Sequence, residues 1–298
     1  MERKVVVITG GTSGIGQAAA VTLASLGARI VLIARDAERA EATLAQLREK
    51  SPTSELDVAH SVYWADLSRV AEVKRVAQEI AAAEPRIDAL INNAGGIFAR
   101  RQVTLEGLER TFATNHVSYF VLTEGLRERL LGSTPARVIN TASDVHRGAR
   151  LDFDDLQSEK GYSGFGAYAK SKLCNVLFTR ELARRLAGSG VTANCLHPGV
   201  VATRFGQDRG QDGGDPSAAS FLRSTGIPPE EGAQTIVYLA FSPEVAQVSG
   251  QYFYQCRAKV PSSDAQDDRT AQRLWRETLR VVGGGEESRG ARKTAGGS

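Results

Sequence analysis

Short apolar runs alternate along this chain with longer stretches in which apolar residues recur every three or four positions. Runs such as VVVIT, IVLIA and ALINN are continuously apolar, which is typical of strands covered on both faces. The longer stretches have the period of amphipathic helices. The predicted strands span residues 4–9, 29–34, 61–65, 87–92, 137–141, 192–196 and 251–254. The predicted helices span residues 14–27, 36–50, 69–83, 104–131, 162–187, 229–241 and 267–282.

This regular alternation predicts an α/β fold in which about seven strands form one doubly wound parallel sheet with helices on both faces. No Pro/Gly linker divides the strands, so residues 1–282 are predicted to form a single domain. Residues 203–227, rich in Gly, Asp and Ser, interrupt the pattern and are predicted to form a lid over the substrate. Residues 283–298 have too few apolar side chains to join a core and are predicted to be a disordered polar tail.

Composition narrows the class of protein. The 298 residues carry a net charge of +3, which gives no reason to expect nucleic acid or an anionic membrane as a partner. The three cysteines (Cys174, Cys195 and Cys256) are far apart and odd in number, which favours a reducing compartment over a disulfide framework. No apolar run approaches the ~20 residues of a membrane span, and no His or Cys motif suggests a metal. We therefore expect a soluble, cytoplasmic protein without a metal.

The first predicted strand runs directly into a glycine-rich turn, GGTSGIG, at residues 10–16. A pyrophosphate needs a tight turn, close approach of the backbone and free N–H groups at a helix N-terminus. Because this turn follows a strand and opens a helix within a βαβ unit, it predicts a dinucleotide site. The residues predicted to bind there are Gly10, Thr12, Ser13, Gly14, Ile15 and Gly16.

The residue that ends the second strand indicates which dinucleotide is bound. An acidic residue at this place would accept a hydrogen bond from the ribose 2′-hydroxyl of NAD. This chain has Ala34 followed by Arg35, which can pair with a 2′-phosphate, and Arg39, one helical turn later, could assist it. We therefore predict that NADP(H) is preferred over NAD(H). In the alternative interpretation, Arg35 is a solvated residue at a helix start.

Tyr168 and Lys172 stand at i and i+4 on the predicted helix 162–187 and so share one face. A neighbouring ammonium favours the phenolate, which suits a tyrosine to proton transfer near neutral pH. Ser143 follows the strand RVINT, Asn115 lies within a predicted helix, and NNAG (92–95) closes another strand. Ser143 and NNAG thus place further polar groups at the carboxyl ends of the strands.

In order and spacing, TGGTSGIG, NNAG, Asn115, Ser143, YAKSK and HPG resemble the short-chain dehydrogenase/reductase family, whose members have a Rossmann fold. The resemblance extends from about residue 3 to 282. More narrowly, YAKSKLCNVLFTRELARRL, LHPGVVATRFG and TAQRLWRETLRVVG resemble the retinol dehydrogenase and WW-domain oxidoreductase branch.

The resemblance implies a role for each matching residue. Tyr168 exchanges a proton with the substrate oxygen, Lys172 tunes Tyr168 and binds the nicotinamide ribose, Ser143 polarises the carbonyl, and Asn115 anchors a water in the proton relay. Further cofactor contacts are implied for Asp66, Leu67, Asn93, Ala94, Gly95, Pro198, Gly199, Val201 and Thr203. Helices 104–131 and 162–187 are implied as the surface of a possible homo-oligomer.

These observations predict an NADP(H)-dependent alcohol dehydrogenase or carbonyl reductase for a hydrophobic substrate, with reduction as the working direction. Candidate apolar walls are Phe98, Val145, Phe165, Phe205 and Phe221. A non-catalytic NADP(H)-binding sensor or scaffold is the alternative, although such a protein should have lost Tyr168 or Lys172. Protochlorophyllide reductases share the Tyr-Lys helix and a cysteine placed like Cys174, with little else in common.

The histidines and Cys174 are mostly interpreted as structural. His146 is close enough to Ser143 in sequence to be a candidate substrate contact. His60 is predicted to lie at the surface, and Cys174 to be a packed core thiol rather than a catalytic one.

Overall fold

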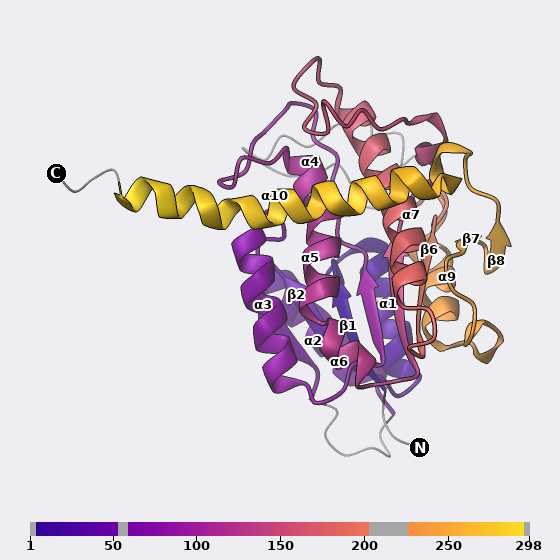
Figure 1. The fold of residues 1–298 in the computed structure, drawn as a ribbon. Coiled ribbons are helices and arrows are strands. Elements are labelled where there is room, and N and C mark those ends of the chain that lie inside the picture. Colours follow the sequence, from indigo (N-terminus) through magenta and orange to yellow (C-terminus); the bar gives the residue numbers. More distant parts are fainter. Residues whose placement is uncertain (1–3, 53–58, 203–225, 295–298) are drawn as a thin grey trace.

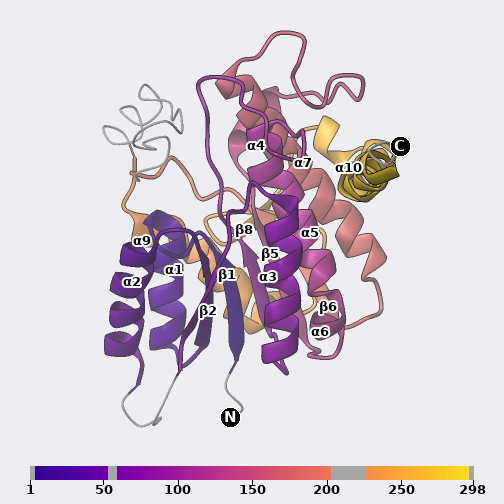
Figure 2. The same cartoon turned by 90° about the vertical axis from the view of Figure 1, so that its left-hand side faces the viewer.

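The computed structural model of the chain describes residues 4–52, 59–202 and 226–294, with side chains described as far as residue 283. Within these ranges the strands form one sheet in the order β3-β2-β1-β4-β5-β6-β7-β8, with helices on both faces (Figures 1 and 2). The strands are β1 (Val5–Thr9), β2 (Arg29–Ala34), β3 (Ser61–Trp64), β4 (Ala89–Asn92), β5 (Ala136–Thr141), β6 (Val191–Leu196), β7 (Tyr252–Tyr254) and β8 (Arg257–Lys259). The doubly wound sheet predicted from the sequence is confirmed.

The sheet has one strand more than the seven predicted. Strands β1 to β7 are parallel to their neighbours, whereas β8 pairs antiparallel with β7 at the edge of the sheet. A tight turn joins the two, in which Gln255 and Cys256 have positive φ angles of 48° and 58°. Strand β8 was not predicted from the sequence, because its three residues, RAK, are all exposed and show no apolar periodicity.

The helices and helical turns follow the predicted alternation. They are α1 (Gly14–Ser25), α2 (Ala37–Lys50), α3 (Val70–Ala83), α4 (Arg110–Phe112), the π-helix η1 (Ala113–Val117), α5 (Ser118–Gly125), α6 (Arg127–Leu131), the 3-10 turn η2 (Asp144–Gly148), α7 (Gly164–Arg185), α9 (Pro229–Phe241), the 3-10 turns η3 (Pro243–Val245) and η4 (Asp264–Gln266), and α10 (Asp268–Thr294).

The single helix predicted at 104–131 is divided in the structure and begins only at Arg110. The Glu109 carboxylate fixes this start by accepting hydrogen bonds from the backbone N–H groups of Thr111 and Phe112, both at 2.8 Å. A π-helical turn then carries Asn115, and the helix is interrupted again at Leu126. Apolar periodicity continues across these breaks, which is why the pattern alone joined them.

Two hydrophobic layers enclose the sheet. On one face, Val6 and Ile8 of β1 belong to a buried cluster with residues of α1 and α9. On the other face, Val7 belongs to a cluster with residues of α3, α5 and α7. Because successive strand residues point to opposite faces, both neighbours must be apolar. The sandwiched sheet therefore accounts for the continuous apolar runs of the sequence.

Helix α10 crosses the outside of α5 and α7 (Figure 1). Its Trp275 is 3% exposed, stacks on Phe178 of α7 at 5.7 Å and meets Phe120 of α5 edge-on at 4.8 Å. The face of α5 and α7 that carries these rings is thus covered by the chain itself. Helix α10 also continues to Thr294, so the end predicted for it near Val282 is wrong.

Among the described residues, no helix combines the length and the hydropathy that crossing a membrane requires.

Candidate functional site

The glycine turn and NNAG lie side by side, because β1 and β4 are neighbours although they are distant in sequence. The chain leaves these two strands toward opposite faces of the sheet, which is where ligands bind in doubly wound folds. Thr9 joins the two loops: its hydroxyl accepts hydrogen bonds from the backbone N–H groups of Asn93 and Ala94 at 2.8 and 3.0 Å. The Asn93 side-chain amide in turn donates to the Thr9 carbonyl at 3.2 Å.

The conformation of the glycine turn fits a pyrophosphate. Gly10 and Gly14 have φ angles of +66° and +53°, which side chains rarely tolerate. A Cβ on Gly16 would collide with the Gly10 carbonyl, so the turn can close onto α1 only without a side chain there. Ser13 stands at the N-cap of α1, and its hydroxyl makes no capping hydrogen bond. The first N–H groups of α1 are therefore not capped by this side chain, as an anion site requires.

Arg35 directly follows β2 and is exposed at the same edge of the sheet. The next residue, Asp36, is the N-cap of α2: its carboxylate accepts from the Arg39 N–H at 3.0 Å and pairs with the Arg39 side chain at 3.2 Å. The acidic group next to Arg35 is thus engaged in capping. The suggestion that Arg39 assists Arg35 is weakened, because the Arg39 side chain is paired with Asp36.

Asp66 follows β3 at the same edge, and Leu67 comes next. The Asp66 carboxylate accepts hydrogen bonds from the N–H and hydroxyl of Ser68 at 2.9 and 2.8 Å. Its own backbone N–H donates to Glu72 at 2.8 Å. In the structure Asp66 therefore shapes the turn that leads into α3, and its contact with the cofactor stays a prediction.

Tyr168 and Lys172 lie on one face of α7, as predicted, with the Lys172 Nζ 5.5 Å from the centre of the Tyr168 ring. Lys172 is 2% exposed and donates to the Thr141 carbonyl at the end of β5 at 2.9 Å. Ser143, two residues beyond that strand, hydrogen-bonds Tyr168. Helix α7 and strand β5 thus bring Ser143, Tyr168 and Lys172 together.

Burial dominates the electrostatics of this group. It lowers the pKa of Lys172 to about 7. It also raises the pKa of Tyr168 to about 12, against the opposing effect of the hydrogen bond from Ser143. The phenol is thus protonated at neutral pH. The expected lowering of the Tyr168 pKa by Lys172 is not seen in the chain by itself, because burial removes water that would stabilise either charge.

A chain of contacts links this group to the glycine turn. The Thr141 hydroxyl donates to the Asn93 Oδ1 at 3.2 Å, while the Thr141 carbonyl receives Lys172. A Cβ built on Gly95 would lie 3.6 Å from the Lys172 Nζ and 3.2 Å from the Asn115 Oδ1. The NNAG loop thus passes between the predicted cofactor and catalytic residues. Thr9 and Thr141 both hydrogen-bond Asn93 of this loop. They were not identified from the sequence, because an isolated Thr at a strand end carries no sequence signal.

Asn115 is completely buried in the π-helix η1. Its side chain exchanges two hydrogen bonds with the backbone of Gly96, at 2.8 and 2.9 Å, and its Nδ2 also donates to the Ser171 hydroxyl at 2.9 Å. The amide therefore holds the NNAG loop against α7. A π turn often marks a functional site.

The last of the residues implied as cofactor contacts follow β6. Gly199 has a φ of +93°, and its N–H donates to the His197 Nδ1 at 3.1 Å. Val201 forms an isolated bridge with Ile227, and Pro198 lies in the turn between them and β6. Thr203, the wall candidates Phe205 and Phe221, and most of the predicted lid at 203–227 lie outside the described residues.

The remaining wall candidates differ in exposure. Phe98 is 3% exposed and lies under the Arg110 guanidinium, whereas Phe165 is 60% exposed and Val145 is half-buried. Phe98 is therefore packed rather than open to a ligand.

His60 is buried, not at the surface as predicted. It accepts from the Ile30 N–H at 3.1 Å and contacts the Ser51 hydroxyl at 3.0 Å, which ties β2 to the end of α2. Cys174 is 1% exposed, and burial raises the pKa of its thiol. The prediction of a packed core thiol is thus supported.

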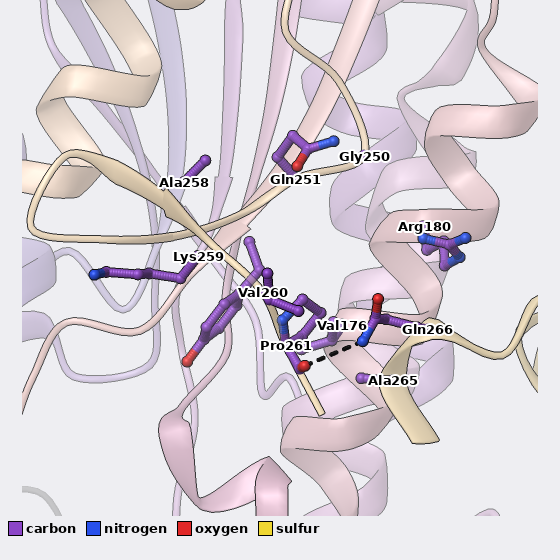
Figure 3. Close-up of a pocket in the computed structure, with 11 residues that line it drawn as sticks. Val176, Arg180, Gly250, Gln251, Ala258, Lys259, Val260, Pro261, Ala265 and Gln266 are labelled. Atoms are coloured by element: carbon purple, nitrogen blue, oxygen red, sulfur yellow. Dashed lines mark hydrogen bonds between the residues drawn. The ribbon is translucent and has the colours of Figure 1, made fainter. Parts of the chain in front are cut away.

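The cavity drawn in Figure 3 lies away from Tyr168. It has a volume of about 320 Å³ between α7, the β7–β8 hairpin and the segment that leads to η4. Ser143, Tyr168 and Lys172 do not line it.

Comparison with known proteins agrees with this geometry. The family model for short chain dehydrogenases matches residues 4–213. The chain is 40% identical to human retinol dehydrogenase 13, over 94% of this chain and 85% of the relative. It is 39% identical to mouse retinol dehydrogenase 14, over 95% and 87% of the two chains.

A solved structure of Pseudomonas aeruginosa RhlG in an NADP active-site complex matches with a TM-score of 0.65 and 27% identity, over 88% of this chain and 96% of the other. The chain belongs to the short-chain dehydrogenase/reductase family of oxidoreductases. Within that family it is similar to the retinol dehydrogenases.

Proposed function

We propose that this protein is an NADP(H)-dependent oxidoreductase that interconverts a hydrophobic alcohol and its aldehyde or ketone. The observation that carries the proposal is the convergence of Ser143, Tyr168 and Lys172 beside a glycine turn suited to a pyrophosphate. The names of the retinol dehydrogenases among the relatives support an apolar, retinoid-like alcohol as the substrate class.

The residues of the chain divide the work as follows. NADPH, when bound, supplies the hydride that reduces the carbonyl carbon. Ser143 orients the carbonyl by hydrogen-bonding its oxygen, and Tyr168 gives that oxygen the proton that completes the alcohol. The raised pKa of Tyr168 keeps the phenol protonated, which suits it to donate in the direction of reduction. Lys172 is anchored on Thr141. The negative phenolate left behind favours the charged form of Lys172, and the two opposite charges stabilise each other.

Arg35 is proposed to select NADP(H) through the 2′-phosphate. It directly follows β2 and is exposed at the same edge of the sheet as the glycine turn. A charge-assisted hydrogen bond contributes about 1.5–3 kcal/mol. Arg35→Ala should therefore raise KM for NADPH by about 10-fold or more and leave KM for NADH unchanged. Arg48→Ala, at an exposed position on α2, is the matched control. An equal rise for both cofactors in Arg35→Ala would contradict this role.

The decisive experiment follows NADPH oxidation with a panel of apolar aldehydes and ketones, using the full chain and Tyr168→Phe. We expect turnover that the variant loses by at least 100-fold while it still binds NADPH, because the phenylalanine keeps the ring and removes the proton. Tight NADPH binding without turnover on any carbonyl would instead favour the non-catalytic sensor.

A further inference from the structure

His146 lies in the 3-10 turn η2, three residues after Ser143, and is completely buried. Both of its ring nitrogens have partners. Nδ1 lies 2.7 Å from the Ser143 carbonyl oxygen, and Nε2 lies 3.1 Å from the backbone nitrogen of Ser262. A backbone N–H can only donate, so Nε2 accepts and the proton sits on Nδ1, which donates to Ser143. The ring is therefore neutral in one defined tautomer.

The bond at Nδ1 fixes the backbone of Ser143. The Ser143 carbonyl also accepts from the His146 N–H at 3.2 Å, so two donors from one residue hold it. On the other side, the Ala142 N–H donates to the Leu196 carbonyl at 2.7 Å. The Ser143 backbone is thus held in an extended conformation, with φ −162° and ψ 154°, between two anchors.

This arrangement also leaves the Ser143 hydroxyl available. Ser143 is the N-cap of η2, a position where a serine side chain usually bonds a backbone N–H of the following turn. Here the side chain makes no such bond, and the N–H of His146 goes to the Ser143 carbonyl instead. The hydroxyl is turned to Tyr168.

The imidazole is itself anchored from outside the turn. Its ring meets the Tyr252 ring of β7 edge-on at 5.0 Å, and Nε2 is tied to Ser262 in the segment before η4. Beside it, the Arg147 guanidinium donates to the Val260 carbonyl at 2.7 Å. Val260 also lines the cavity of Figure 3. Residues 260–262 are therefore clamped to the turn that carries Ser143.

We propose that His146 is a positioning residue for Ser143: its Nδ1–H holds the Ser143 carbonyl so that the hydroxyl points to Tyr168 and the substrate oxygen. His146 does not touch the substrate, in contrast to the contact considered from the sequence. The inference rests on the proposed function, because Ser143 has its role there.

Two substitutions of His146 test the roles of its two ring nitrogens separately. The Nδ2 of asparagine falls where Nδ1 of histidine lies, and the terminal amide of glutamine falls where Nε2 lies. His146→Gln keeps a partner for Ser262 and loses the donor to Ser143, so its kcat should fall about 10- to 100-fold, the cost of misplacing a reacting group by about 1 Å. His146→Asn restores that donor and keeps Ser143 in place, so kcat should stay within about 3-fold of that of the unmodified protein. The dissociation constant for NADPH should not change in either variant.

Arg147→Ala is the matched control, because it removes the neighbouring contacts with Val260 and Asp144 and leaves both donors to the Ser143 carbonyl in place. It should leave kcat unchanged. A fall in kcat as deep as that of His146→Gln would overturn the proposal, since the clamp as a whole would then be responsible. Equal losses in folded His146→Asn and His146→Gln would overturn it as well.

Ser143→Ala separates the two proposals. If its kcat is unchanged, the proposed function fails. If it falls while His146→Gln stays fully active, only the role of His146 fails. Should the variants not fold, nitrogen-15 spectra of the unmodified protein still give a test, because the chain has only 4 histidines. We expect His146 to be protonated at Nδ1, and a proton on Nε2 would refute the assignment.

Discussion

Replacing Lys172 by methionine should make the protein more stable while it destroys activity. Lys172 is 2% exposed, and burial lowers its pKa from 10.5 to about 7. Each pKa unit corresponds to 1.36 kcal/mol, so burying the ammonium costs about 5 kcal/mol below pH 7. Methionine has a similar length and no charge, and removing the charge removes this cost.

The lost hydrogen bond offsets only part of that gain. Below pH 7 the charged Lys172 donates to the Thr141 carbonyl, and a hydrogen bond from a charged donor contributes about 1.5–3 kcal/mol. The carbonyl is not orphaned in the variant, because the Asn175 amide also donates to it at 3.2 Å. The net stabilisation expected at pH 6 is therefore about 2–3.5 kcal/mol.

The sign of the pH dependence follows from proton binding. Between pH 7 and 10.5 the unfolded chain keeps the Lys172 proton and the folded chain has released it. The free energy of unfolding of the unmodified protein therefore rises with pH through this window. The advantage of Lys172→Met should be full at pH 6 and disappear by about pH 10.5.

Urea unfolding without cofactor at pH 6, 8 and 10 measures this difference, with Lys160→Met, an exposed position, as the matched control. The control should show no such pH-dependent gain. The reasoning would be refuted if Lys172→Met were less stable than the unmodified protein at pH 6, or if its advantage did not shrink toward pH 10. A stabilised but inactive variant would mean that Lys172 is kept for its chemistry at the expense of the fold.

Two further predictions concern the glycine turn and α10. Gly16→Ala should weaken NADPH binding by about 10-fold or more, because the new methyl collides with the Gly10 carbonyl and overpacking of this kind costs about 1–3 kcal/mol. Fluorescence titration measures the NADPH affinity, and an unchanged affinity would count against the site. Trp275→Ala should lower the free energy of unfolding by about 3–5 kcal/mol, because it empties the space beside Phe178. Leu279→Ala, at a position 49% exposed on the same helix, should lower it far less. Equal losses for the two variants in denaturant unfolding would contradict the packing.

The sequence by itself determined the sheet, its parallel strands and the place of the glycine turn. Continuous apolar runs arise wherever a strand is covered on both faces, and the helical period follows from 3.6 residues per turn. Such signals are local, so VVVITGGTSGIG was enough to locate the turn. The pairing of Tyr168 with Lys172 was also local, because i and i+4 always share a helix face.

Only the tertiary structure decided which distant residues meet and how their charges behave. Segments far apart in sequence are linked by the hydrogen bonds of Thr9 and Thr141 with the NNAG loop and by that between His146 and Ser262. The sequence pattern could not locate the π turn at Asn115 or strand β8, because neither element alters the periodicity of the apolar residues. The pKa values of Tyr168 and Lys172 depend on burial, which is a property of everything packed around them. The order of residues along the chain does not by itself show how deeply a side chain is buried in the folded protein.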